Sequence, residues 1–248
     1  MKRLPSRSIR AARRQRGMGL VELLVVMLIS LFMMMGLFSI VYGTRTNYMA
    51  QNQLSQLQDS ERLAMNLISN VVQTGGYFPN PATTTAAAAL PPATIAGIAF
   101  ASGQAISGVA GDQIYVRYVA GTNDGIMDCN GQTNTTGAAL TDVNTFYVNG
   151  SQQLVCQVIA NGVPGAVQPV VNGVTGMAVM YGVDVNADLS ADEYQTAAQV
   201  NAAGAWNNVV SVRVTLTFAN ALAGAAAPGA GAAPQPTLTR VIDLLNKS

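Results

Sequence analysis

A long apolar run dominates the N-terminal part of the chain. The 20 residues Leu23–Tyr42 (LLVVMLISLFMMMGLFSIVY) carry no charge. At about 1.5 Å rise per residue, a helix of this length spans roughly 30 Å, the thickness of the hydrocarbon core of a bilayer. A secretory signal peptide has an apolar region of only about 7–15 residues and then a small-x-small cleavage site, which Thr44–Tyr48 does not offer. The pattern therefore predicts a membrane-spanning helix.

Apolar positions with helical spacing continue beyond this run, between Thr44 and Thr74. They lie three, four or seven residues apart, on one face of a helix: Leu54, Leu57, Ala64, Ile68 and Val71. Gly75-Gly76 then supplies a helix stop. We expect a membrane-spanning segment over residues 18–43 and an amphipathic segment over residues 44–75, together a rod of roughly 85 Å. The apolar face is expected to pack against the domain that follows it.

Short runs of alternating polar and apolar residues follow, and they predict a β-rich head over residues 76–248. Six runs are strand-like: Gln113–Val119, Asn144–Asn149, Gln153–Ile159, Thr175–Val183, Val209–Phe218 and Thr237–Leu245. Asn149-Gly150 is a hairpin turn signal between two of them. The low-complexity stretches Pro79–Pro92 and Ala219–Pro236 are predicted to be loops. We expect an α+β fold, with one antiparallel β domain on a long N-terminal helix.

Positive charge is concentrated at the N-terminus. Seven basic residues and no acid lie within the first 17 positions: Lys2, Arg3, Arg7, Arg10, Arg13, Arg14 and Arg16. The other 231 residues hold six basic and twelve acidic groups, a net charge of −6. Basic residues ahead of the apolar run keep the N-terminus in the cytoplasm and send the body of the chain across the membrane. The acidic body argues against nucleic-acid binding, because phosphate contacts need clustered Lys and Arg.

The composition removes much of the catalytic repertoire. The chain has no histidine, which excludes a Ser-His-Asp triad, a Cys-His dyad and a His-ligated zinc. Lysine occurs only as Lys2 and Lys247, which makes a Schiff-base or Ser-Lys arrangement unpromising. We therefore expect that the chain is not an enzyme.

One acid, Glu22, stands at the start of the apolar run. A carboxylate inside a membrane segment costs about 2.5–3.5 kcal/mol at the centre and less near the interface, so it is a candidate for function. The pair Arg13-Arg14 upstream also allows a twin-arginine signal, but the residues that flank the pair fit that signal badly. For Glu22, the simpler interpretation is a solvated glutamate at the membrane interface. The context GMGLVELL (Gly17–Leu24) weighs against that interpretation.

This stretch resembles the class III signal of type IV pilins and type II secretion pseudopilins. That signal has a basic leader ending in Gly, a cut, an apolar residue and Glu at the fifth mature position. The resemblance implies that a prepilin peptidase cuts between Gly17 and Met18, removes the leader 1–17 and methylates the new amine. Glu22 would then be the fifth mature residue and would neutralise the N-terminal amine of a neighbouring subunit in the filament. Met18 departs from the Phe that the family usually has.

Motifs in the rest of the chain resemble the PilW family of minor pilins. They run through most of the chain: Ser60–Phe78 (SERLAMNLISNVVQTGGYF), Gly111–Gly131 (GDQIYVRYVAGTNDGIMDCNG), Asn144–Cys156 (NTFYVNGSQQLVC), Gly173–Asp184 (GVTGMAVMYGVD), Trp206–Phe218 (WNNVVSVRVTLTF) and the closing LLNK. The resemblance implies the type IV pilin-like fold. It also implies a place in a low-abundance complex that primes pilus assembly, sits at the tip beneath an adhesin and supports twitching motility.

The implied partners are the other minor pilins, the major pilin, the tip adhesin, the prepilin peptidase and the inner-membrane assembly platform. The implied location is the inner membrane, as a single-pass protein with a periplasmic C-terminus, and afterwards the extracellular pilus. The alternative is the related pseudopilin J of type II secretion, which has the same place in a shorter filament.

The two cysteines, Cys129 and Cys156, both lie beyond the membrane, in what should be an oxidising compartment. They flank the predicted hairpin, and a bridge would close a loop of about 28 residues, worth roughly 3–4 kcal/mol in the entropic account. We expect a disulfide, with two free thiols as the alternative.

One acidic segment, DVNADLSADE (Asp184–Glu193), has the spacing of a calcium loop. Five residues stand at positions one, three, five, seven and nine: Asp184, Asn186, Asp188, Ser190 and Asp192. Leu189 replaces the usual Gly at position six, and Gln195 replaces the Glu at position twelve. An ordinary acidic turn between strands is therefore the alternative, and no other cofactor is expected.

Three classes of function compete. A filament component explains the leader, Glu22, the rod and the missing catalytic groups. A membrane-anchored enzyme would need a catalytic constellation that the sequence does not offer. An anchored adhesive domain explains the Thr- and Asn-rich head but not the GMGLVEL signal.

Overall fold

The computed structural model describes residues 19–109, 112–220 and 235–247. The leader, the predicted cleavage position Gly17–Met18 and most of the predicted loop Ala219–Pro236 lie outside the described residues. The chain divides into two compact units, Met1–Asn52 and Gln53–Ser248.

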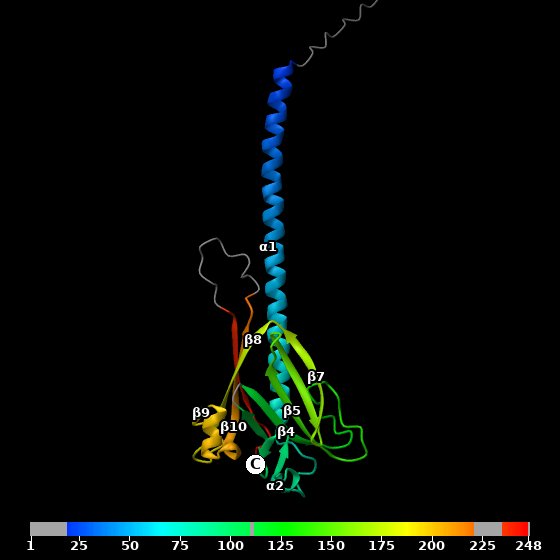
Figure 1. The fold of residues 1–248 in the computed structure, drawn as a ribbon, viewed down its shortest axis with the longest axis vertical. Coiled ribbons are helices and arrows are strands. Elements are labelled where there is room, and N and C mark those ends of the chain that lie inside the picture. Colours follow the sequence, from blue (N-terminus) through cyan, green and yellow to red (C-terminus); the bar gives the residue numbers. More distant parts are fainter. Residues whose placement is uncertain (1–18, 110–111, 221–234, 248) are drawn as a thin grey trace, which may run out of the picture. The chain divides into compact units, whose positions relative to one another are not determined.

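One helix, α1 (Leu20–Thr74), forms the N-terminal part (Figure 1). Its 55 residues contain no proline, so every N–H beyond the first turn can bond within the helix. The helix ends as predicted at the glycine pair. Gly75 N–H bonds Val72 O at 3.0 Å, and Gly76, at φ +79°, donates its N–H to Arg117 O at 2.9 Å. A left-handed residue is the usual way to end a helix, and glycine takes it without strain.

The predicted apolar face of α1 is largely confirmed. Ala64 and Ile68 are fully buried and Val71 is 2% exposed, while Leu57 is partly buried against the same core. The prediction for Leu54 is wrong, because its side chain is 46% exposed. The following turns add Met65 and Val72 to the buried face.

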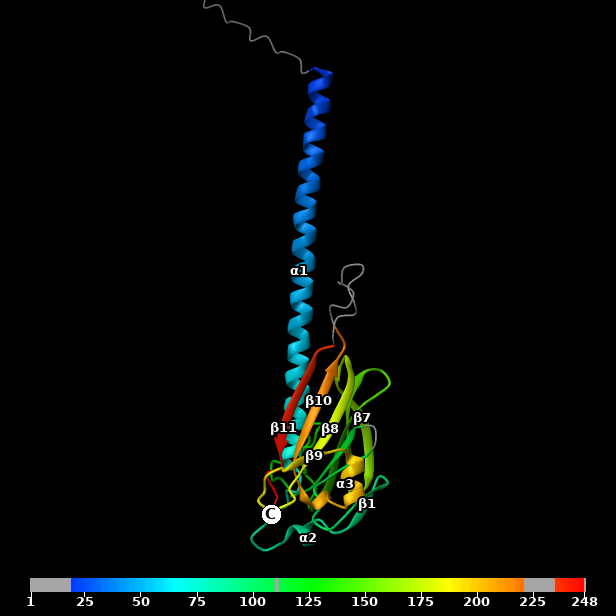
Figure 2. The same ribbon diagram turned by 90° about the vertical axis from the view of Figure 1, so that its left-hand side faces the viewer.

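The described residues of the head form three antiparallel sheets, as predicted for the fold class. The four-stranded sheet has the order β11-β10-β8-β9, and Figure 2 shows β11, β10 and β8 side by side. Its strands are β8 (Val174–Val183), β9 (Glu193–Gln195), β10 (Val209–Phe218) and β11 (Thr237–Asp243). The five-stranded sheet has the order β3-β4-β5-β6-β7. Its strands are β3 (Ile106–Val109), β4 (Gln113–Ala120), β5 (Leu140–Val148), β6 (Gln153–Ala160) and β7 (Val163–Asn172). The strands β1 (Ala93–Ile95) and β2 (Ile98–Phe100) form a separate pair.

The principal core joins the C-terminal part of α1 to both larger sheets. The helix contributes Ile68, the five-stranded sheet Phe146 and the four-stranded sheet Val214, all fully buried. Alternation along β10 follows the predicted pattern, with Val210, Val212, Val214 and Leu216 buried. The exception is Ser211, which is predicted to face solvent and is only 2% exposed.

Strand boundaries differ from the prediction in five of the six strands. β10 is reproduced without change, and β4, β6 and β8 each differ by one residue at one end. The larger differences are in β5, which begins four residues earlier than Asn144, and in β11, which ends two residues before Leu245. The predicted Asn149-Gly150 turn does join β5 and β6, with Asn149 Oδ1 accepting the N–H groups of Ser151 and Gln153 at 3.0 Å.

Several short elements and one long strand are missing from the prediction. The stretch Pro79–Pro92 contains the one-turn helix α2 (Ala86–Ala89), capped by the Thr85 hydroxyl. Between β9 and β10 the chain forms α3 (Ala197–Ala203) and the 3₁₀ turn η1 (Trp206–Asn208). The largest omission is β7, whose sequence VPGAVQPVVN carries two prolines and a glycine.

Candidate functional site

The first turns of α1 contain Glu22, the acid singled out by the sequence. Glu22 N–H bonds Gly19 O at 2.9 Å, so the residue lies within the first turn, where the helix dipole favours a carboxylate. Its side chain is exposed. The structure therefore leaves the carboxylate open to a group from outside the chain.

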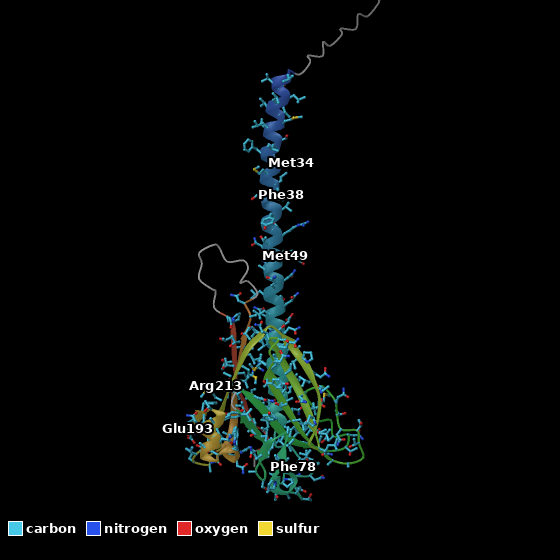
Figure 3. The ribbon with its side chains drawn as sticks, in the orientation of Figure 1. Met34, Phe38, Met49, Phe78, Glu193 and Arg213 are labelled. Carbon is cyan, nitrogen blue, oxygen red and sulfur yellow. A yellow bond between two sulfur atoms is a disulfide. The ribbon has the colours of Figure 1, made fainter. Side chains whose placement is uncertain are left out.

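The apolar run after Glu22 is exposed along its length, as the labelled Met34 and Phe38 illustrate (Figure 3). These two side chains are 73% and 74% exposed. By length and composition α1 could cross a membrane. Apolar surface on this scale needs a membrane or neighbouring helices to cover it.

Three hydroxyls on this part of α1 are satisfied within the helix. Ser30 and Thr44 donate to Met27 O and Ile40 O at 2.8 Å, and Thr46 donates to Gly43 O at 2.9 Å. Internal bonding of this kind lets polar side chains lie in surroundings that offer no water.

A disulfide joins Cys129 to Cys156, which confirms the predicted pair. The Cα atoms are 6.4 Å apart, within the usual range. The bridge fastens the segment 121–139, which connects β4 to β5, onto β6. Cys129 N–H also bonds Asn144 Oδ1 at 3.1 Å, and the buried Asn134 donates to Ala120 O and Ala138 O at 2.8 Å. We call residues 121–139 the bridged loop.

Arg117 on β4 is a buried cation, 1% exposed. Its guanidinium donates to four backbone carbonyls and lies 4.7 Å from the centroid of the Phe100 ring. The acceptors are Leu90 O, Pro91 O, Ala101 O and Gln104 O, at 2.9 to 3.3 Å. Burial lowers the pKa of Arg117 to about 10, so it stays charged at neutral pH. The side chain holds the segment 90–104 against β4, a positioning role that sequence analysis missed although one Arg stands out in QIYVRYV.

The acidic segment after β8 forms a turn closed by its own hydrogen bonds. Asp184 Oδ1 accepts from Ala187 N–H at 2.7 Å and Asp184 Oδ2 from Leu189 N–H at 2.8 Å. Asp188 Oδ1 accepts from Ser190 N–H at 2.8 Å, and Asp192 Oδ2 accepts from Val185 N–H at 2.9 Å.

This bonding sets the protonation of Asp184. Partial desolvation raises the pKa of its carboxyl, but the N–H donors outweigh it and hold the pKa below the ordinary value. Over the described ranges, no three His, Cys, Asp or Glu side chains form a cluster able to hold a metal ion. The geometry is that of an acidic turn, and calcium binding by Asp184, Asn186, Asp188 and Asp192 stays a prediction.

A cavity of about 570 Å³ lies between this turn and the end of the chain. Its polar groups include the Tyr194 hydroxyl, which is 3.3 Å from Ser211 Oγ. The Arg213 guanidinium lies 4.5 Å from the centroid of the Tyr194 ring, on the part of the four-stranded sheet labelled in Figure 3. Lys247 also lines the cavity, but its Nζ donates to Asn207 O. The Tyr194–Ser211 contact joins two hydroxyls, either of which could be the donor.

Two family models match separate parts of the chain. Residues 12–38 match the prokaryotic N-terminal methylation motif, a range that includes Gly17, Met18 and Glu22. Residues 141–234 match type IV pilus-assembly protein W, a range that runs from β5 past β10. No curated protein matches the chain. The two matches confirm the resemblance drawn from the sequence motifs.

Proposed function

We propose that this chain, a PilW-like type IV minor pilin, primes assembly of the pilus and forms part of its tip complex. The observation that carries the proposal is the presence of both matches on one chain, the methylation motif over 12–38 and the pilus-assembly family over 141–234. The first is a signal for processing and membrane insertion, and the second is specific to an assembly protein. A pilin role needs no catalytic constellation, in keeping with the absence of histidine from the sequence.

Processing would convert a membrane-anchored precursor into a subunit. A prepilin peptidase would cut between Gly17 and Met18 and methylate the new amine. The cut would remove the seven basic residues that hold the N-terminus at the cytoplasmic headgroups. One cationic amine would then stand next to an apolar helix.

Glu22 is the group that we expect to meet such an amine on a neighbouring subunit. An ion pair in a low dielectric is costly to break, because removing one partner leaves a buried charge uncompensated. The pair would therefore fix the axial register of adjacent helices. The exposed carboxylate of Glu22 and the exposed apolar surface after it support this role.

A tip position suits this head better than a position in the body of the filament. A body subunit repeats identical contacts with every neighbour. Here the head extends over residues 76–248 and includes the low-complexity stretch Ala219–Pro236, which a helical lattice would have to accommodate at every repeat. A subunit present in few copies at the tip, where each copy contacts different partners, would not have to pack this stretch at every repeat. The partners would be the other minor pilins, the major pilin and a tip adhesin, reached from the inner-membrane assembly platform.

Deletion of the gene tests the proposal. Surface pili and twitching motility should fall sharply and return when the gene is supplied in trans. Blocking pilus retraction in the deletion strain should partly restore pili, because a priming subunit speeds initiation and does not supply bulk material. Intact pili and motility, together with lost export of folded enzymes across the outer membrane, would instead support the alternative, a type II secretion pseudopilin.

A further inference from the structure

A buried carboxylate lies beneath the bridged loop, in a part of the head that the pilin role does not explain. Asp142 on β5 is 8% exposed, and its Oδ1 atom has no hydrogen-bond partner among the described residues. Buried carboxylate oxygens in native proteins are normally hydrogen-bonded or bound to a cation, because an unsatisfied one pays its full desolvation cost. The oxygen therefore indicates a missing ligand.

The register of the sheet places Asp142 on the face that the bridged loop covers. Tyr118 on β4 is its direct cross-strand partner. Asn144, two residues along the same strand, points to the same face and accepts the N–H of Cys129 from the bridged loop. One N–H of the Asn144 amide is donated to the Tyr118 hydroxyl at 3.0 Å, and neither group bonds Asp142 Oδ1.

Another acid acts on Asp142 through its charge. Burial, and to a lesser degree the carboxylate of Asp128 next to Cys129 in the bridged loop, raise the pKa of Asp142 to about 6. Asp128 Oδ1 accepts the N–H groups of Asn130 and Gln132 at 2.8 and 2.9 Å, so this carboxylate is held in place. Arg117, the cation next in sequence to Tyr118, donates its hydrogen bonds to the four backbone carbonyls described above and makes none to Asp142 Oδ1.

We propose that Asp142 and Asp128 form a binding site for a hard divalent cation of the calcium class, which ties the bridged loop to β5. Two carboxylates with no basic partner among the described residues offer the hard oxygen ligands that calcium prefers. Carbonyl oxygens and water complete the shell, because the described residues contain no cluster of three acidic side chains. A site with two carboxylates belongs to the weak class, with Kd on the order of 10⁻⁴–10⁻³ M as in extracellular modules.

This site is separate from the acidic turn at Asp184–Glu193. In that turn the carboxylates of Asp184, Asp188 and Asp192 all accept N–H groups of the local backbone. In the proposed site Asp128 does so too, but Asp142 Oδ1 accepts none among the described residues. The proposal is also independent of the pilin role, since it concerns only how the head is held together.

Thermal unfolding of the full chain in detergent tests the site, with Trp206 fluorescence reporting on the head. Samples at pH 7.5 contain either EDTA or 5 mM calcium chloride, and the variants are Asp142→Asn, Asp128→Asn and the control Asp188→Asn in the acidic turn. We expect calcium to raise the unfolding midpoint of the parent chain and of Asp188→Asn by about 2–9 °C. Asp142→Asn and Asp128→Asn should show less than a third of that rise.

A terbium titration provides a direct readout. Terbium replaces calcium in oxygen sites and is sensitised by a nearby phenol, here Tyr118, so its luminescence should appear with the parent chain and be displaced by calcium. Asp128 is partly exposed, so Asp128→Asn keeps the test valid if Asp142→Asn does not fold. A midpoint that calcium leaves unchanged in the parent chain, or a rise of equal size in the Asp128 variant, would overturn the proposal. A rise abolished by Asp188→Asn alone would also overturn it and would assign the ion to the acidic turn.

Discussion

At the scale of single residues, the account depends most on Glu22, the one acid in a segment otherwise free of charge. We expect Glu22→Ala and Glu22→Gln to lower co-purification of the chain with sheared pili by roughly tenfold or more, because a neighbour's amine would lose its partner in a low dielectric. The membrane level and the folding of the head should not change. Asp59→Ala, an exposed acid further along α1, is the matched control. Undiminished incorporation of both Glu22 variants would contradict the assigned role.

Arg117 should be irreplaceable even by lysine. A lysine ammonium has three donors on one atom and no planar fork, so Arg117→Lys leaves carbonyls of the segment 90–104 without a donor. We expect the free energy of unfolding of the head to fall by about 2–4 kcal/mol, measured by urea with Trp206 fluorescence. The control Arg213→Lys, at a partly exposed site on the four-stranded sheet, should cost less than about 1 kcal/mol. Equal losses for both variants would show that the buried guanidinium has no special role.

The raised pKa of Asp142 predicts that this residue makes the folded head less stable as the pH rises. Its pKa rises from an ordinary 3.8 to about 6 in the folded head, so the folded state binds a proton more tightly than the unfolded chain. In EDTA, its contribution to the free energy of unfolding should therefore decrease as pH rises from about 4 to about 6. Asp142→Asn should remove this decrease and gain about 1–3 kcal/mol relative to the parent between those pH values. Parallel pH profiles for parent and variant, over pH 4 to 7, would rule out the assigned protonation.

At the scale of elements, the disulfide fastens a long connection that has little regular structure of its own. Cys129 and Cys156 are separated by 27 residues, and the entropic account gives about 3–4 kcal/mol for a loop of this length. The double variant Cys129→Ala/Cys156→Ala should lose that amount and become sensitive to proteases within the bridged loop. Asn130→Ala, exposed in the same loop, should keep the bridge and the protection. Cleavage at equal rates in the two variants would contradict this account.

The sequence predicts those elements whose pattern agrees with their place in the fold. β10 was reproduced because alternating apolar residues face a core on one side. The prediction omits β7 because Pro164, Gly165 and Pro169 are unfavourable in a central strand. β7 lies at the edge of its sheet, where only one neighbouring strand needs backbone N–H donors, so the missing N–H of a proline is tolerated. The one-turn α2 and the short strands depend on contacts such as those of Arg117, which no local pattern reveals.

The same contrast separates the candidate sites. The cysteine pair and the N-terminal signal are local or compositional features, and they could be read from the chain. The proposed site at Asp142 and Asp128 depends on the strand register and on the path of the bridged loop, which no local sequence pattern reveals. The acidic turn has the spacing of a calcium loop, and its carboxylates bond to the local backbone, so calcium binding there stays a prediction.

At the scale of the whole molecule, the chain combines an apolar helix that requires an outside covering with a head that has its own core. The N-terminal part of α1 exposes apolar side chains that only a membrane or other helices can cover, and the head has a core and a disulfide of its own. Seven basic residues, in the predicted leader outside the described residues, precede them in the sequence. This combination supports the proposed pilin role, in which the helix would be held in the membrane before assembly and in the filament core afterwards.

The most direct measurement of this central claim is mass spectrometry of pili sheared from the cell surface, with and without an active prepilin peptidase. The account predicts that sheared pili contain this chain in trace amounts relative to the major pilin, with an N-terminal peptide that begins at methylated Met18. In cells without the peptidase the chain should stay in the membrane and begin at Met1. An N-terminus at Met1 in both strains, a cut beyond Tyr42, or the absence of the chain from sheared pili would contradict the account.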